Sequence, residues 1–151
     1  MPDVLTLDAS PELSDGVIRQ CLASFRHVRL RTTGGCMEPM LSAGETVLVA
    51  GTALRRPRIG DMVLVRQSAG LRLHRLIWGP PFALPSSGWR TMSDRAQTWD
   101  ARVSPRDVLG TVVGVEGTPR RAVRSRPGVA VRSLCRGLGT RLRLVLRRRV
   151  P

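Results

Sequence analysis

The chain has 151 residues, which is enough for one cored domain with an appendage but too few for two full domains. Its formal net charge of +14 is unevenly distributed, because residues 118–151 hold eleven arginines and no acid, whereas residues 1–117 hold fourteen arginines and eleven acids. The high charge therefore belongs to a C-terminal tail, and the body of the chain does not have the composition of a nucleic-acid-binding domain.

The residue types that are present also restrict the chemistry. Every basic residue is arginine and there is no lysine or tyrosine, so His27 and His74 are the side chains suited to act as bases near neutral pH. Cys21, Cys36 and Cys135 are not spaced like a disulfide framework or a zinc site, which favours a reducing compartment and neither a metal nor another cofactor. No run of about 18 apolar residues is present and the N-terminus is acidic, so we expect neither a membrane span nor an export signal.

In chain order, the first predicted element is an amphipathic helix within residues 1–27. Ser10 suits its N-cap, and apolar residues then recur every four positions: Leu13, Val17, Cys21 and Phe25. From Val28 apolar residues alternate with arginine, which predicts a short strand that leads into the pair Gly34-Gly35.

The remaining pattern predicts a mainly β domain of short strands over residues 28–117. Four further runs are apolar or alternating and are bounded by turn residues: 46–50, 62–66, 71–78 and 108–116. Residues 79–88 contain three prolines and predict an excursion loop. The Arg-rich tail, residues 118–151, has apolar residues at spacings of three and four, which indicates a cationic amphipathic helix.

Cys36 is the first candidate for chemistry. It follows Gly34 and Gly35, which permit unusual backbone angles, and it lies shortly before Pro39, which stiffens the exit from the turn. A nucleophile on such a turn is exposed, and its own N–H can face a developing oxyanion. The alternative interpretation is a small, buried apolar side chain in a glycine turn.

His74 and two carboxylates are the second set of candidates. Strand alternation places His74 on the same face as Arg72, so an ordinary surface histidine is one interpretation. Asp94 and Asp100 lie in a polar connection before the last strand, where either could orient an imidazole by accepting its N–H. The alternative for both is turn formation, to which aspartate is well suited.

Together these segments resemble the superfamily of type I signal peptidases and LexA-type self-cleaving repressors, whose nucleophile is a serine followed by Met-x-Pro-x-Leu and then Gly-Asp. Residues 36–41 here read Cys-Met-Glu-Pro-Met-Leu, with Gly44-Glu45 in place of Gly-Asp. The other family elements appear in the family's order: Gly60-Asp61, His74-Arg75, Ser93-Asp94, Asp100 and Gly110-Thr111-Val112. The histidine at the base position is similar to the branch of endoplasmic-reticulum, archaeal and some Gram-positive signal peptidases.

The resemblance implies a signal-peptidase-like fold and an endopeptidase that cleaves an extended peptide or protein precursor, such as a leader or signal peptide. Its catalysis would be a Cys-His-Asp variant of the Ser-His-Asp mechanism, without a metal or cofactor. The implied site residues are Cys36, His74 and either Asp94 or Asp100 for catalysis, Gly34, Gly35 and Cys36 for the oxyanion turn, and Met37 and Pro39 for substrate contact.

Departures from the family pattern shape these expectations. A thiol suits a histidine base, because imidazole can draw it into a thiolate–imidazolium pair. Gly34 stands where many relatives have a hydroxyl that assists the oxyanion, and Ser93 replaces a glycine. The family's N-terminal membrane anchor is missing, so we expect a cytoplasmic location, with peripheral attachment to the inner face of the membrane through the tail as an alternative.

Two other functions stay open. One is an inactive relative that keeps the peptide groove and binds leader peptides or partners. The other gives the function to the Arg-rich tail, which would bind an anionic membrane surface or nucleic acid. The tail has no aromatic residue for base stacking, which favours the membrane over nucleic acid.

Overall fold

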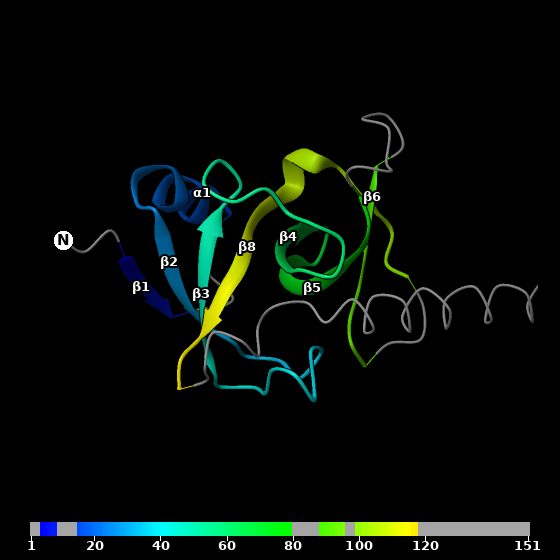
Figure 1. The fold of residues 1–151 in the computed structure, drawn as a ribbon, viewed down its shortest axis with the longest axis horizontal. Helices are drawn as coiled ribbons and strands as arrows, with labels where there is room; N and C mark the ends of the chain where they lie inside the picture. The colour runs from blue at the N-terminus through cyan, green and yellow to red at the C-terminus, as the bar shows by residue number, and fades with distance from the viewer. Residues whose placement is uncertain (1–3, 9–14, 80–87, 96–98, 118–151) are drawn as a thin grey trace, which may run out of the picture.

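The computed structural model of the chain describes residues 4–8, 15–79, 88–95 and 99–117. Most of the predicted excursion loop, the tail with its expected helix, and the start of the predicted N-terminal helix lie outside these residues. The described part is mainly β, as the sequence predicts, and it consists of a single sheet with a short α-helix (Figure 1).

The sheet has eight strands in the order β1-β2-β3-β8-β4-β5-β6-β7. Neighbouring strands are antiparallel except β1 and β2, which are parallel. The elements are β1 (Val4–Asp8), α1 (Asp15–Ser24), β2 (His27–Arg31), β3 (Thr46–Gly51), β4 (Met62–Gln67), β5 (Gly70–Trp78), β6 (Trp89–Met92), β7 (Arg102–Val103), the 3₁₀ turn η2 (Pro105–Asp107) and β8 (Val108–Val115).

The five strands predicted from apolar runs are present within one or two residues, whereas β1, β6 and β7 were not predicted. β1 lies within the segment that the sequence assigns to an N-terminal helix, and it pairs with β2 from Val4 opposite His27 to Asp8 opposite Arg31. Residues 1–27 therefore form a strand of the sheet as well as the helix that packs against it. The segment reads Val-Leu-Thr-Leu-Asp, a short apolar run of the kind that predicts a strand, although no strand was predicted for it.

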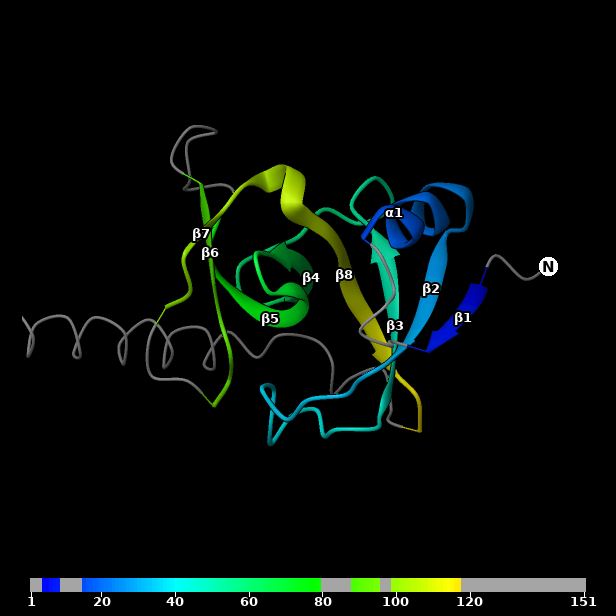
Figure 2. The ribbon, with the colours of Figure 1, turned by 180° about the vertical axis from the view of Figure 1, so that it is seen from behind.

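The buried face of α1 differs from the predicted one. Ile18 is only 1% exposed and packs in the core with the partly buried Cys21 and Leu22, whereas Val17 and Phe25 are exposed. The helix contacts β2, β3 and β8, as Figure 2 shows from behind. The residues of α1 that face the core are thus spaced by three and four positions. The prediction that Val17 and Phe25 lie on the buried face is wrong.

The sheet bends strongly between its two halves. In Figure 1, β2, β3 and β8 run between the top and the bottom of the picture, whereas β4 and β5 are seen nearly end-on. Register shifts interrupt the pairing of β8 with both β3 and β4, which is where an irregularity lets a sheet turn. Two clusters of buried side chains lie on opposite faces of β4, which contributes Met62 and Leu64 to one and Val63 and Val65 to the other. The second core is formed by Val63, Val65, Leu76, Val103 and Val108. The first core, which includes Ile18 of α1, is formed by Ile18, Val28, Leu30, Met37, Leu41, Val47, Val49, Met62, Leu64, Leu109, Val112 and Val115.

A network of ion pairs joins α1 to the far half of the sheet. Arg66 at the end of β4 binds Asp15 of α1 at 2.9 Å and Asp107 of η2 at 2.6 Å. Arg19 of α1 also reaches Asp107, at 3.7 Å. All four side chains are partly exposed, so the network orients the helix more than it stabilises the fold.

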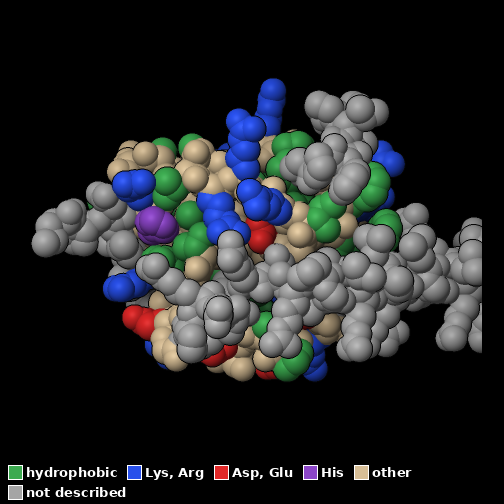
Figure 3. All heavy atoms as spheres, in the orientation of Figure 1, with side chains coloured by type: hydrophobic (Ala, Val, Ile, Leu, Met, Phe, Trp, Pro, Cys, Tyr) green, Lys and Arg blue, Asp and Glu red, His purple; other side chains and the backbone are tan. Residues whose placement is uncertain are grey.

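Among the described residues, no helix is both long and apolar enough to cross a membrane. On the face shown in Figure 3, basic side chains are interspersed with apolar and acidic ones. That side of the described chain therefore presents no continuous basic surface, which agrees with the near-balanced charge of residues 1–117.

Candidate active site

Cys36 lies on the connection from β2 to β3, which is fixed by its apolar residues. The side chains of Met37 and Leu41 are each 1% exposed and belong to the first core. The turn between them is closed by the N–H groups of Met40 and Leu41, which donate to the carbonyl of Met37 at 3.0 and 3.1 Å. Cys36 itself is half-buried and packs against the first core.

The other residues predicted to form the site at this turn differ in their exposure and in their backbone angles. The burial of Met37 does not agree with the prediction that its side chain contacts a substrate, whereas Pro39 is exposed as that prediction requires. Neither Gly34 nor Gly35 has a positive φ, so the turn does not use the left-handed angles that glycine permits. A Cβ on Gly35 would lie 2.7 Å from a carboxylate oxygen of Glu38, while the position around Gly34 is open.

His74 lies on β5 and is buried, with 3% of the residue exposed. The interpretation as an ordinary surface histidine is therefore wrong. From His74 to Ile77 every residue of β5 is buried, because this half of the strand is covered on both faces. The turn at Gly60-Asp61 extends the pairing along it, since the N–H of Gly60 donates to the carbonyl of Leu76 at 2.7 Å and the N–H of Leu76 donates to that of Asp61 at 2.9 Å.

Asp100, in the connection from β6 to β7, contacts the imidazole of His74. Its carboxylate oxygen Oδ2 accepts a hydrogen bond from His74 Nδ1 and another, of 2.8 Å, from the hydroxyl of Thr91. Its backbone is held by Thr91, whose carbonyl accepts from the Asp100 N–H at 2.9 Å, and by Arg90, whose guanidinium donates to the Asp100 carbonyl at 2.9 Å. A proton on Nδ1 leaves Nε2 as the ring nitrogen available for proton transfer.

The side chain of Cys36 also interacts with His74. The thiol is 3.5 Å from the carbonyl oxygen of Leu73, the residue that precedes the histidine. Nε2 of His74 is buried and forms no regular hydrogen bond with any described residue. Burial acts to lower the pKa of His74, but the hydrogen bond with Asp100, the interaction with the Cys36 side chain and the charge of Asp100 raise this pKa from 6.5 to about 9.

Asp94 is placed elsewhere. Its carboxylate binds Arg75 through both oxygens, at 2.7 and 2.6 Å, and both side chains are almost fully buried. The same guanidinium donates to the carbonyl of Gly60 at 2.6 Å. The N–H of Arg95 donates to the carbonyl of Cys36 at 3.3 Å, so this ion pair connects the His74 strand to the Cys36 turn. Of the two aspartates that the sequence left open, Asp100 and not Asp94 contacts His74.

Thr91 and Gln67 belong to this constellation but were not identified from the sequence. Thr91 is fully buried, and the Gln67 amide contributes to lowering the pKa of Asp100. A threonine inside a strand and a glutamine at a strand end are ordinary at such positions, so no sequence signal distinguishes them.

No family model matches the chain, and no curated protein has a similar sequence. Among the described residues, no group of three or more His, Cys, Asp or Glu side chains could hold a metal ion.

Proposed function

We propose that the chain is an endopeptidase with a signal-peptidase-like fold, in which Cys36 is the nucleophile and His74 the general base. The carboxylate of Asp100 orients the imidazole of His74. One observation carries the proposal: a buried imidazole bonds a carboxylate through Nδ1 and also interacts with a half-buried thiol whose turn packs on the first core. The order of the corresponding sequence elements supports the same class.

The raised pKa of His74 favours a cysteine nucleophile. An imidazole with a pKa of about 9 is largely protonated at neutral pH, which would make it a poor base for a serine hydroxyl. Beside a thiol the same property is useful, because an imidazole that holds its proton can stabilise a thiolate nucleophile as an ion pair. The cysteine and the raised pKa therefore belong to one mechanism.

In that mechanism the Cys36 thiolate attacks the scissile carbonyl carbon, and the carbonyl electrons move to the oxygen. The backbone N–H of Cys36, which donates to no described residue, can stabilise this oxyanion. Collapse of the intermediate forms a thioester as the C–N bond breaks, and the His74 proton at Nε2 passes to the leaving amine. Water then attacks the thioester, His74 accepts its proton, and the thiolate departs.

The substrate we propose is an extended segment of a peptide or protein precursor, bound beside the Cys36 turn by main-chain hydrogen bonds. Pro39 and Met40, which follow the nucleophile, are exposed and are available to contact the side chains of the substrate. A leader or signal peptide fits this class. We propose that the enzyme works in the cytoplasm, with the tail as a candidate for contact with an anionic membrane.

The first test is the reactivity of Cys36 in a chain whose other cysteines, Cys21 and Cys135, are replaced by serine. We expect alkylation by iodoacetamide at pH 6 to be about a hundredfold faster than that of an ordinary thiol with a pKa near 8.5. His74→Ala should abolish this excess and Asp100→Asn should reduce it, whereas His27→Ala, which changes a half-buried histidine on β2, should have no effect. Ordinary thiol reactivity in the parent chain would contradict the enzyme.

The second test separates a peptidase from an inactive peptide-binding relative. Purified protein is incubated with candidate precursors encoded by neighbouring genes, and the products are identified by mass spectrometry. Cleavage by the parent chain and not by Cys36→Ala supports the peptidase. A reactive Cys36 with binding but no cleavage of any precursor would favour the peptide-binding alternative.

A further inference from the structure

The orienting carboxylate of the proposed site is itself held by a residue that neither sequence pattern nor family resemblance singles out. Thr91, on β6, is fully buried and holds Asp100 twice: its carbonyl accepts from the Asp100 N–H at 2.9 Å and its hydroxyl donates to Asp100 Oδ2 at 2.8 Å. The two residues are nine positions apart, so Thr91 closes the connection that brings the aspartate back to the sheet.

The hydroxyl of Thr91 meets the same oxygen, Oδ2, that accepts from His74 Nδ1. An ionised carboxylate only accepts hydrogen bonds, so the threonine must be the donor. Two donors that converge on one oxygen fix the rotation of the carboxylate about its Cβ–Cγ bond. Without the hydroxyl, the carboxylate loses one of the two donors that fix this rotation, so its alignment with the imidazole is less well defined.

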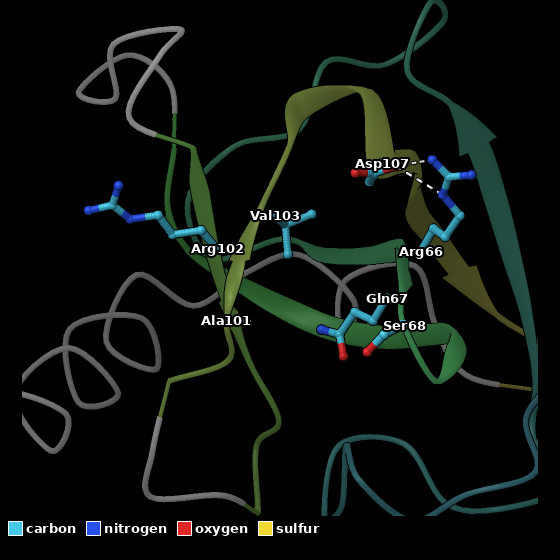
Figure 4. A pocket seen from close by; sticks show the side chains of 7 residues that line it. All are labelled: Arg66, Gln67, Ser68, Ala101, Arg102, Val103 and Asp107. Carbon is cyan, nitrogen blue, oxygen red and sulfur yellow. Dashed lines mark hydrogen bonds and ion pairs between the residues drawn. The ribbon is translucent and has the colours of Figure 1, made fainter.

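Gln67 approaches Asp100 from a different element. It is the last residue of β4 and, with Ser68, Ala101, Arg102 and others, lines a hollow of about 520 Å³ (Figure 4). Burial acts to raise the pKa of Asp100, but the hydrogen bonds with His74 and Thr91, the charge of His74 and the Gln67 amide lower it below 3.8. The amide nitrogen is buried and has no regular hydrogen bond among the described residues, so it is a weaker support than Thr91.

We propose that Thr91 is a positioning residue whose hydroxyl holds the Asp100 carboxylate in the orientation in which it pairs with His74. The role rests on the function proposed above, because the pairing matters for catalysis only if His74 activates Cys36. Among the described residues Thr91 has no hydrogen bond to the thiol or the imidazole, so it acts through Asp100. The charged and titratable groups of the described chain that face His74 are Asp100 and Cys36, and Arg90 contacts the backbone of Asp100.

Thr111 on β8 offers a matched control. It is fully buried like Thr91, but its hydroxyl has no hydrogen-bond partner among the described residues. Thr91→Val and Thr111→Val therefore make the same chemical change at two buried strand positions. Only Thr91→Val removes a hydrogen bond to Asp100. Thr91→Ser keeps the hydroxyl and tests for rescue.

The experiment follows the His74 imidazole by NMR as a function of pH, with His27 as internal reference, and measures alkylation of Cys36 in parallel. In Thr91→Val we expect the midpoint of the His74 titration to fall by about one pH unit, which corresponds to one hydrogen bond to a charged group. Alkylation at pH 6 should slow by about tenfold. Thr91→Ser should resemble the parent chain, and Thr111→Val should leave the titration and the reactivity unchanged.

A titration of Thr91→Val that coincides with that of Thr111→Val would overturn the role of Thr91. If Thr91→Val does not fold, Thr91→Ala, which leaves space and adds no bulk, gives the same comparison. The failure of the proposed function has a different signature: His74→Ala would leave the reactivity of Cys36 unchanged, while the NMR titration would still report whether Thr91 controls the Asp100–His74 pair.

Discussion

At the scale of single residues, two neighbours on β5 have different partners. His74 pairs with Asp100, which orients the imidazole, and Arg75 pairs with Asp94, which connects the strand to the segment beside Cys36. The bidentate pair between Arg75 and Asp94 is nearly fully buried and each carboxylate oxygen has a partner. Removing one member of such a pair leaves an uncompensated charge inside the protein.

Asp94→Ala should therefore act on stability. We expect the free energy of unfolding to fall by about 3–5 kcal/mol, because the Arg75 guanidinium loses its counter-ion in a buried site. The measurement is denaturant unfolding followed by circular dichroism. Glu38→Ala is the control, since the ion pair of Glu38 with Arg95 is exposed and should change stability by less than about 1 kcal/mol. Equal losses in the two variants would contradict this account.

At the scale of elements, the sheet depends on close contact between β3 and β8. A Cβ on Gly110 of β8 would lie 2.6 Å from both the carbonyl oxygen of Ala50 and a methyl of Val49 on β3. Gly110 also adjoins the point where the register between β8 and β4 shifts. Glycine is required here for space and not for its backbone angles, because its φ is not positive. The family-like Gly-x-Val of the closing strand thus has a packing role in this chain.

Gly110→Ala should destabilise the protein by roughly 1–3 kcal/mol, since strand backbone and core side chain must both shift to admit the methyl group. Gly114→Ala on the same strand is the matched control, because its Cβ would meet only Leu48, at 3.7 Å, which is an ordinary contact. The comparison is made by the midpoints of thermal unfolding. A loss of stability in Gly114→Ala as large as in Gly110→Ala would show that the close approach is not the cause.

At the scale of the whole molecule, the His74–Asp100 pair links stability to pH. The pKa of His74 is raised from 6.5 to about 9 on folding, so its contribution is complete below pH 6.5 and is lost as the pH rises through 9. The pKa of Asp100 is lowered from 3.8, so its contribution is present above pH 3.8 and is lost as the pH falls through the lower folded value. The pair therefore contributes most to the free energy of unfolding between about pH 3.8 and pH 6.5.

We therefore expect the free energy of unfolding to decline between about pH 6.5 and 9, as measured by urea unfolding at a series of pH values. His74→Gln should remove most of that decline, because glutamine does not titrate. His27→Gln should keep it, since His27 is half-buried on β2 and outside the pair. A decline of the same size in His74→Gln and in the parent chain would assign the pH dependence to other groups.

The sequence by itself determined the mainly β class and the five strands with apolar or alternating runs. These features depend on local periodicity and on turn residues, which act over a few positions. It also supplied His74 as a candidate base, because a chain without lysine leaves few candidates. It could not choose between Asp94 and Asp100, which lie six positions apart in the same polar connection.

Only the tertiary structure decided that choice, through the pairing of β5 with β6 and the return of Asp100 to Thr91. The same holds for β1, which pairs with a strand beyond the helix, for the face of α1 that Ile18 buries, and for the burial of His74. In each case the outcome depends on which distant segment covers a given side chain. Local periodicity does not contain that information, because contacts between segments far apart in the chain form only when the sheet closes.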